Sequence, residues 1–200
     1  MRPLFRHGVT RRLQRIGWVY LTRTGKLRRV SDLQIAEPSL RTRFLPITKD
    51  NYARVAEFRE RGRVAEYGEK LAGGEIGFFA ECAGIAAGSV WATINRSPAP
   101  VVVRGYMRLM PNEALIHDVV TGERSRGMGV ARFMVASLGT ALFEQYGACQ
   151  IIVDVNVRNG TSLRVMQKAG FPMRETVLSL SAFGHLVFQK TIGPHGNGNS

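Results

Sequence analysis

The sequence predicts one mixed α/β domain behind a basic N-terminal extension. Apolar, β-branched runs of strand length alternate with longer segments of helical periodicity. Two hundred residues suffice for one such domain with a sizeable core and a short appendage. The extension is predicted from charge, because residues 1–30 hold nine Lys or Arg residues and no Asp or Glu, in a chain of net charge +13. We therefore read the basic pI as a property of the extension rather than of the domain.

The predicted extension, residues 1–40, begins with the pattern of an amphipathic helix. Its apolar residues follow helical spacing on one face, and they are Phe5, Val9, Leu13, Ile16 and Tyr20. Such a basic helix binds an anionic membrane surface, nucleic acid or an acidic partner, or packs on its own domain. Disorder and an organelle transit peptide are further alternatives. The sequence leaves these open and favours peripheral docking, on a membrane or a partner, through residues 1–30.

The elements of the domain, residues 41–192, follow from periodicity and turn signals. Thr48 is a plausible cap for the first helix, a glycine pair ends the second, and Ala83 and Gly84 turn a hairpin. The expected strands are 41–47, 75–81, 85–94, 113–121, 151–157, 174–181 and 185–191, with a further strand or ordered loop at 101–109. The expected helices follow Thr48 and then span 64–71, 130–146 and 163–169. Residues 193–200 are expected to form a flexible tail.

The most informative motif lies between the strand at 113–121 and the helix at 130–146. Its residues are Arg124, Ser125, Arg126, Gly127, Met128 and Gly129. Glycines at this spacing let the backbone approach a ligand closely. The free N–H groups and the positive dipole end at the helix start attract anions. A strand, a basic glycine turn and a helix together indicate a cradle for a pyrophosphate.

A second motif follows about thirty residues later, after a β-branched strand. It contains Asn159, Ser162, a short helix, and then Gly170 and Phe171. The two motifs together resemble the GNAT superfamily of acetyl-CoA-dependent N-acyltransferases, over roughly residues 41–191. The resemblance implies a GNAT fold, with a mixed, mostly antiparallel sheet flanked by helices. It also implies transfer of an acetyl or other acyl group from acyl-CoA to a primary amine of a small molecule or peptide N-terminus. The alternative is a non-catalytic acyl-CoA-binding or membrane-associated scaffold module.

The resemblance further implies which residues bind acyl-CoA. In the family a backbone N–H on the strand before the glycine turn stabilises the oxyanion, which points to the amides near Val119 and Val120. The implied cofactor-binding set is Val119, Val120, Thr121, Arg124, Arg126, Gly127, Met128, Gly129, Val130, Ala131, Asn159 and Ser162. Arg132 is available to a CoA phosphate, and no metal is expected.

The attacking amine needs a proton acceptor. Glu113 is the first candidate, because it stands eleven residues before Arg124, as the catalytic glutamate does in histone-type members of the superfamily. His117 shares the face of Glu113 by period-two counting, and the ordinary pKa of histidine suits a base. Asp118 points to the opposite face unless a bulge intervenes, and a carboxylate there is expected to anchor a loop or to receive a cationic substrate instead.

The usual general acid of the family is missing. Many GNAT enzymes place a tyrosine four residues before the Gly-Phe pair, where this chain has Met166. Ser162 or water is therefore the expected proton donor to the departing thiolate. The sequence of helix residues 164–168 resembles more closely the family members that acetylate N-terminal amines, which commonly lack that tyrosine.

Three further observations complete the predictions. Arg104, Tyr106 and Arg108 alternate, which fits either binding of an acidic or sugar-phosphate substrate or one face of an amphipathic strand. Cys82 and Cys149 are expected to be small buried hydrophobic residues in a reducing compartment, and hence in the cytoplasm. No apolar run approaches the roughly 18 residues that span a bilayer. A homodimer is a further expectation.

Overall fold

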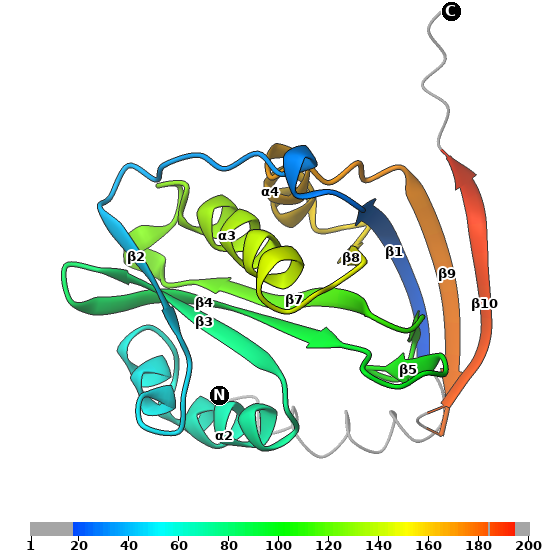
Figure 1. The fold of residues 1–200 in the computed structure, drawn as a ribbon, viewed down its shortest axis with the longest axis horizontal. Coiled ribbons are helices and arrows are strands. Elements are labelled where there is room, and N and C mark those ends of the chain that lie inside the picture. The colour runs from blue at the N-terminus through cyan, green and yellow to red at the C-terminus, as the bar shows by residue number, and fades with distance from the viewer. Residues whose placement is uncertain (1–17, 184, 195–200) are drawn as a thin grey trace, which may run out of the picture.

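The computed structural model describes residues 18–183 and 185–194, which build a large sheet with helices on both faces (Figure 1). The strands of this sheet are β1 (Trp18–Leu27), β2 (Thr42–Pro46), β3 (Ile76–Cys82), β4 (Ile85–Ile94), β7 (Glu113–Thr121), β8 (Gln150–Asn156), β9 (Glu175–Ala182) and β10 (His185–Pro194). They run in the order β10-β9-β1-β8-β7-β4-β3-β2. The β7–β8 pair is parallel and the other pairs are antiparallel. The predicted mixed, mostly antiparallel sheet is confirmed.

Strand β1 corrects the predicted boundary at residue 41. It lies inside the sheet, where Thr22 pairs with Asn156 of β8 and Leu21 pairs with Leu178 of β9. Tyr20 therefore belongs to a strand, and the rest of the predicted amphipathic helix, residues 1–17, falls outside the described residues. The physical reason is local, because the segment is rich in β-branched and aromatic residues, which favour a strand.

Residues 28–40 are also part of the domain. After the short 3-10 helix η1 (Val30–Asp32), the chain crosses over the helices on one face of the sheet (Figure 1). The Gln34 N–H donates to the Ala169 carbonyl at 3.0 Å, and the Ser39 N–H donates to the Met128 carbonyl at 3.0 Å. These bonds connect the predicted extension to the glycine turn through Met128 and to the second motif through Ala169.

The two faces of the sheet carry different layers. One face holds α3 (Val130–Glu144) and α4 (Gly160–Lys168), close to their predicted positions. The other holds η2 (Tyr52–Glu57), η3 (Arg61–Arg63), α2 (Val64–Ala72) and a separate hairpin of β5 (Val101–Val103) and β6 (Met107–Leu109). The helix predicted after Thr48 is thus a 3-10 helix. The segment predicted as a strand or loop is a hairpin, because Arg104 and Gly105 both adopt positive φ and turn the chain.

Each layer buries its own core. On the α3 side, Met134, Leu138 and Leu142 pack against the sheet and are fully buried. On the α2 side, Tyr67 meets Trp91 edge-on with ring centroids 5.1 Å apart. Full burial of one leucine or methionine side chain stabilises the fold by about 1.5–3 kcal/mol.

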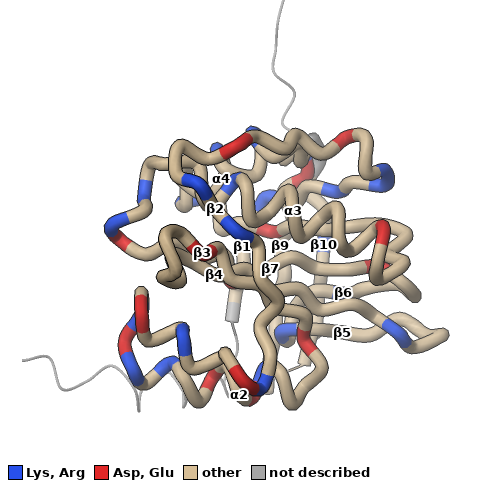
Figure 2. Tube along the Cα trace, turned by 60° about the vertical axis from the view of Figure 1, so that its left-hand side comes forward, with Lys and Arg blue, Asp and Glu red and all other residues tan. Residues whose placement is uncertain are grey.

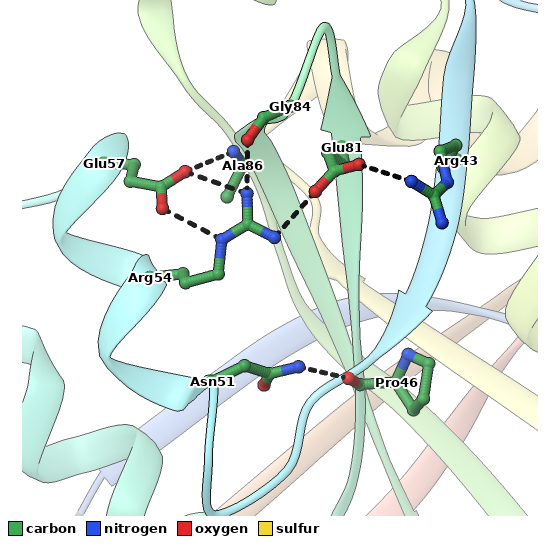
Figure 3. A network of polar contacts seen from close by, with 8 residues as sticks. All are labelled: Arg43, Pro46, Asn51, Arg54, Glu57, Glu81, Gly84 and Ala86. Atoms are coloured by element: carbon green, nitrogen blue, oxygen red, sulfur yellow. Dashed lines mark hydrogen bonds and ion pairs between the residues drawn. The ribbon is translucent and has the colours of Figure 1, made fainter.

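A polar network fixes η2 onto the β3–β4 hairpin (Figure 3). Arg54 donates to Glu57 at 2.9 Å, to Glu81 at 2.7 Å and to the Gly84 carbonyl at 2.8 Å. The hydrogen bond from Arg54 holds the pKa of Glu57 below its usual value. The bond to Glu81 is the most shielded of the three, because the Glu81 side chain is only 9% exposed.

The prediction that both cysteines are buried is wrong. Cys82 is half-buried at the end of β3, whereas Cys149 is exposed in the loop before β8, and both are free thiols. The predicted tail begins too early, because β10 continues through Pro194, and residues 195–200 fall outside the described residues. Among the described helices, none is long and apolar enough to span a membrane.

Candidate active site

The site begins where two neighbouring strands separate. β7 and β8 pair from Glu113 with Gln150 to Ile116 with Val153, and their parallel register ends there. The next residues, His117 on β7 and Asp154 on β8, are therefore the first that do not pair across these two strands, and we call this point of separation the opening. Leu115 and Ile152 pack with the β5–β6 hairpin, so period-two alternation puts His117 and Asp154 on that same face.

A β-bulge in β7 follows the separation point. His117 pairs with Trp91 and Val120 pairs with Ser89, so two β7 residues stand opposite one β4 residue. Asp118 is one of the two and adopts φ +47°. Its carboxylate contacts Lys70 and lies 3.7 Å from Arg59. Burial alone would raise the pKa of Asp118, but Lys70 and Arg59 hold it below its usual value. The Asp118 carboxylate is thus engaged by two cationic side chains at the bulge.

The glycine turn opens α3 as predicted. Gly127 and Gly129 adopt φ +79° and +82°, a region that favours glycine. Gly129 is the N-cap of α3 and supplies no side-chain cap. The first backbone N–H groups of α3 have no intrahelical partner, and the helix dipole adds positive potential there. This end of α3 is therefore suited to a phosphate group.

The start of α4 lies near the glycine turn, because Asn159 and Ser162 line one cavity together with Gly127 and Gly129. Asn159 is the N-cap of α4, and its side-chain oxygen accepts the Ser162 N–H at 3.1 Å. This bond fixes both predicted residues at the helix end and satisfies one of the free N–H groups.

A cavity of about 780 Å³ lies between the glycine turn, the start of α3, and α4; we call it the β7–α4 cavity. The predicted cofactor residues that line it are Val119, Val120, Thr121, Arg126, Gly127, Gly129, Val130, Ala131, Asn159 and Ser162. Its lining also includes four basic residues, Arg126, Arg132, Arg164 and Lys168, and no acidic one. The sequence reasoning missed Arg164 and Lys168, whose spacing of four on one helix face was the available signal.

Arg124 and Met128 line a different cavity. It measures about 880 Å³, shares Val120, Thr121, Ser125 and Arg126 with the first, and extends toward η2 and the β3–β4 hairpin. These two predicted cofactor residues are therefore not gathered with the others.

The structure does not bring Glu113 to the opening. Glu113 is the first residue of β7 and lies before the separation point. Its carboxylate accepts the Met110 N–H at 2.8 Å and the Gln150 side-chain amide at 2.7 Å. It lines a third cavity of about 260 Å³, which shares no residue with the β7–α4 cavity. This placement argues against the predicted role of Glu113 as the base.

His117 lies at the opening, but both ring nitrogens are engaged. Its Nδ1 lies 3.0 Å from the Arg104 guanidinium, which only donates, so Nδ1 accepts and Nε2 carries the hydrogen. Nε2 lies 3.0 Å from Thr93 Oγ1 and 3.4 Å from Glu75 Oε2. Burial, with Arg104 and Lys70, lowers the pKa of His117 to about 3. The imidazole is therefore neutral and has no free lone pair for a substrate proton.

Asp154 is the residue that sequence reasoning missed. It follows the last β7–β8 pair, and its Oδ2 accepts the Tyr106 hydroxyl at 2.5 Å. Burial raises the pKa of Asp154, and it also raises that of Tyr106, with the neighbouring carboxylate adding to the effect. Tyr20 of β1 stacks on Tyr106 with centroids 4.4 Å apart. A lone carboxylate inside an otherwise apolar strand was the signal that could have identified it.

Met166 lies where the family's usual tyrosine would stand. It is 5% exposed, lines the β7–α4 cavity and belongs to the core beneath α3. Its thioether has no proton to donate.

Known proteins share a family pattern and a fold with this chain. Residues 39–171 match the Acetyltransferase (GNAT) family. No curated protein matches the chain.

Solved structures of GNAT proteins share the fold. A GCN5-related N-acetyltransferase from Kribbella flavida is 10% identical with a TM-score of 0.55, over 88% of this chain and 64% of its own. An acetyltransferase from the GNAT family of Colwellia psychrerythraea is 12% identical with a TM-score of 0.57, over 83% and 57%. The aminoglycoside N-acetyltransferase AAC(6')-Iy in complex with CoA is 19% identical with a TM-score of 0.53, over 68% and 91%. The chain thus spans about three fifths of the first two proteins and most of the third.

Proposed function

Because the chain belongs to the GNAT acetyltransferase family, we propose that it transfers an acetyl or other acyl group from acyl-CoA to a primary amine of a small molecule or a peptide N-terminus. The observation that carries the proposal is the β7–α4 cavity, whose basic and acid-free lining joins the open N-terminus of α3 to the separation of β7 and β8. The similarity to AAC(6')-Iy, which has been solved with a CoA-linked acetylneamine analogue, supports a small amine acceptor.

The cavity suggests how acyl-CoA is held. The pyrophosphate lies over Gly127 and Gly129, against the N–H groups that begin α3. Arg126, Arg132, Arg164 and Lys168 supply the opposing charge. The pantetheine arm then follows the end of β7, and the thioester reaches the bulge, where the N–H groups near Val119 and Val120 stabilise the oxyanion.

The chemistry requires few side chains. The amine nitrogen attacks the thioester carbonyl, a C–N bond forms, and the C–S bond breaks when the tetrahedral intermediate collapses. The proton that the amine loses passes to Asp154, directly or through one water. CoA leaves as the thiolate and takes a proton from water or from Ser162, which lines the cavity.

Asp154 suits this role better than the three predicted bases. It lies just past the separation point, on the face of the β5–β6 hairpin. Its raised pKa gives a stronger base than an ordinary aspartate. Glu113 lies before the opening, His117 has no free lone pair, and Asp118 is neutralised by Lys70 and Arg59.

Two measurements test the function. Titration calorimetry with acetyl-CoA should show binding, and a thiol-release assay over a panel of amines and peptides should reveal an acceptor. CoA binding without thiol release on any acceptor would favour the non-catalytic module instead. Absence of CoA binding by a folded protein would reject both.

A cytoplasmic location and a homodimer stay predictions. The free thiols of Cys82 and Cys149 are compatible with a reducing compartment that also supplies acetyl-CoA. Sedimentation velocity on the full chain tests the dimer.

A further inference from the structure

The net charge of +13 is concentrated in one part of the molecule. Residues 32–154 carry fourteen basic and fourteen acidic residues, so this stretch is neutral. Residues 18–31 and 155–194 together carry nine basic residues and one acidic residue, Glu175. Residues 1–17 add five arginines and no acid. The excess charge therefore belongs to both ends of the chain, and not to an N-terminal extension alone.

The fold brings the two charged stretches together. β10, β9 and β1 are consecutive strands at one end of the sheet, and α4 lies nearby on one face (Figure 1). The nine basic residues are Arg23, Lys26, Arg28, Arg29, Arg158, Arg164, Lys168, Arg174 and Lys190. Glu175 is already paired with Lys26 at 2.9 Å. The layer around α2, in contrast, shows acidic and basic residues side by side (Figure 2).

The same end of the sheet exposes apolar side chains. Val19 pairs with Leu180, Leu21 pairs with Leu178, and Phe188 pairs with Leu180, so these residues share one face. Val19 is 67% exposed, Phe188 43% and Ile192 48%. We call this surface the β1–β9–β10 face.

The face is on the α4 side of the sheet, beyond the reach of that helix. Gly25 follows Leu21 by four residues on β1, so both lie on the same face of the sheet. A Cβ on Gly25 would meet Phe171 and Met173 of the core beneath α3 and α4. Toward the other end of β1 nothing among the described residues covers Val19 or Leu21, which are exposed. The β9–β10 turn extends the apolar area with Phe183, which is 76% exposed.

The charge and the apolar side chains together indicate which partner fits the β1–β9–β10 face. A second copy of the chain would oppose two surfaces of the same positive sign, and residues 1–17 are themselves positive. Nucleic acid would satisfy the positive charge but would leave the aliphatic side chains of Val19 and Ile192 without a partner. An anionic bilayer satisfies both, because its headgroups attract basic residues and its acyl boundary accepts apolar ones.

We propose that the β1–β9–β10 face is a docking surface for an anionic lipid bilayer. The proposal rests on described residues alone, namely the exposed apolar residues of this face and the basic residues of the same end of the sheet. Arg164 and Lys168 line the β7–α4 cavity, whereas Val19, Phe188 and Ile192 do not, so the docking surface rests on the apolar residues and on the other seven basic residues.

The first experiment removes the apolar contribution. Full-length protein is sedimented with vesicles of equal parts phosphatidylglycerol and phosphatidylcholine, and with phosphatidylcholine alone. Wild type should bind only the first and be released by salt. The double variant Val19→Thr and Phe188→Thr, which keeps strand-forming residues, should lose about tenfold or more in affinity. The control variant Ile85→Thr and Val102→Thr changes residues that are 57% and 45% exposed on the neutral part, and should bind as wild type does.

The second experiment removes charge and remains informative if the first variant does not fold. Arg174→Gln with Lys190→Gln should weaken binding to anionic vesicles by about tenfold or more, since each basic residue near the surface contributes roughly fivefold. Lys49→Gln with Arg61→Gln, two exposed basic residues of the neutral stretch, is the matched control. Acetyl-CoA affinity of every variant reports whether its fold is intact.

Three results would overturn the proposal. The first is equal binding of wild type and both test variants to anionic vesicles. The second is a dimer in sedimentation velocity that Val19→Thr with Phe188→Thr dissociates, without any vesicle binding, which would assign the face to a second copy. The third is tight binding of duplex DNA that the charge variant weakens, together with no binding to vesicles.

Discussion

The proposed acyl-CoA side of the site (the donor side) and the proposed amine side (the acceptor side) differ in how the chain builds them. The donor side is one continuous stretch, β7 through α4, and the groups that we propose to act there are largely backbone N–H groups at a bulge and at helix ends. The acceptor side gathers Tyr20, Tyr106, His117 and Asp154 from four different strands or loops. Backbone chemistry depends on local conformation, which short motifs specify. Side-chain chemistry at the acceptor side depends on long-range pairing, which motifs do not specify.

Removal of β1 should have the largest effect. A shortened chain that begins at Asp32 loses the strand that pairs with both β8 and β9. The sequence-based boundary at residue 41 would leave the domain of such a chain whole and able to bind CoA. We expect it to be unfolded, because β8 and β9 would each lose the backbone hydrogen bonds to β1, in the interior of the sheet. Circular dichroism and acetyl-CoA titration would measure this, and a folded, CoA-binding product would show that β1 is dispensable.

A charge on the glycine turn tests the donor side alone. Gly127→Asp should weaken acetyl-CoA binding by roughly 10²-fold, because it places a carboxylate beside the pyrophosphate. Gly127→Asn is the matched control, since asparagine tolerates the same positive φ without a charge. No atom lies within 4 Å of a Cβ built at this position, so both variants should fold. Equal affinities for the two would mean that the phosphates bind elsewhere.

Loss of the Asp154 carboxylate tests the acceptor side alone. Asp154→Asn should lower turnover by about 10²-fold or more, a typical general-base contribution, while acetyl-CoA affinity stays unchanged. Tyr106→Phe removes the hydrogen bond to Asp154 without removing the carboxylate, and should have a smaller effect.

The same assay separates the rival bases. Glu113→Gln should keep turnover near wild type, because the Glu113 carboxylate bonds only to Met110 and Gln150 among the described residues. If Glu113→Gln abolishes turnover and Asp154→Asn does not, the base assigned from the strand spacing is right and the geometric argument is wrong.

The donor side was predictable and the acceptor side was not, for physical reasons. The ends of β7, α3 and β8 fall within about two residues of the expected positions, since strong periodicity and glycine punctuation mark them. β1 was missed because the density of arginines before and after it suggested a solvent-facing helix. The roles of Arg104 and Tyr106 were missed because the positive φ of Arg104 and Gly105 turns an apparent strand into a hairpin.

The neutral state of His117 predicts a pH-dependent stability. The pKa of His117 is about 3 in the folded protein and about 6.5 in the unfolded chain. Between these two pH values the imidazole is protonated in the unfolded chain but not in the folded protein. Its contribution to the free energy of unfolding is therefore present above about pH 6.5 and is lost as the pH falls, by up to about 1.4 kcal/mol per unit.

The His117→Gln variant isolates this contribution. Glu75 and Asp154, whose pKa values are raised, act in the opposite direction in both proteins, so the difference belongs to His117. Urea unfolding at about pH 7 and about pH 5 should show a smaller loss of stability for the variant than for wild type. Equal losses would mean that His117 is not held neutral.

The smallest expected effect concerns the position of the missing tyrosine. Met166 is buried at the floor of the β7–α4 cavity, where it contributes packing and no proton. Met166→Leu conserves volume, so it should cost less than about 1.5 kcal/mol of stability and leave turnover almost unchanged. Turnover and thermal unfolding of the variant would be compared with wild type. A large loss of turnover at normal stability would contradict the assignment, because it would mean that the thioether orients the thioester and that α4 contributes a side chain, as well as backbone, to the donor side.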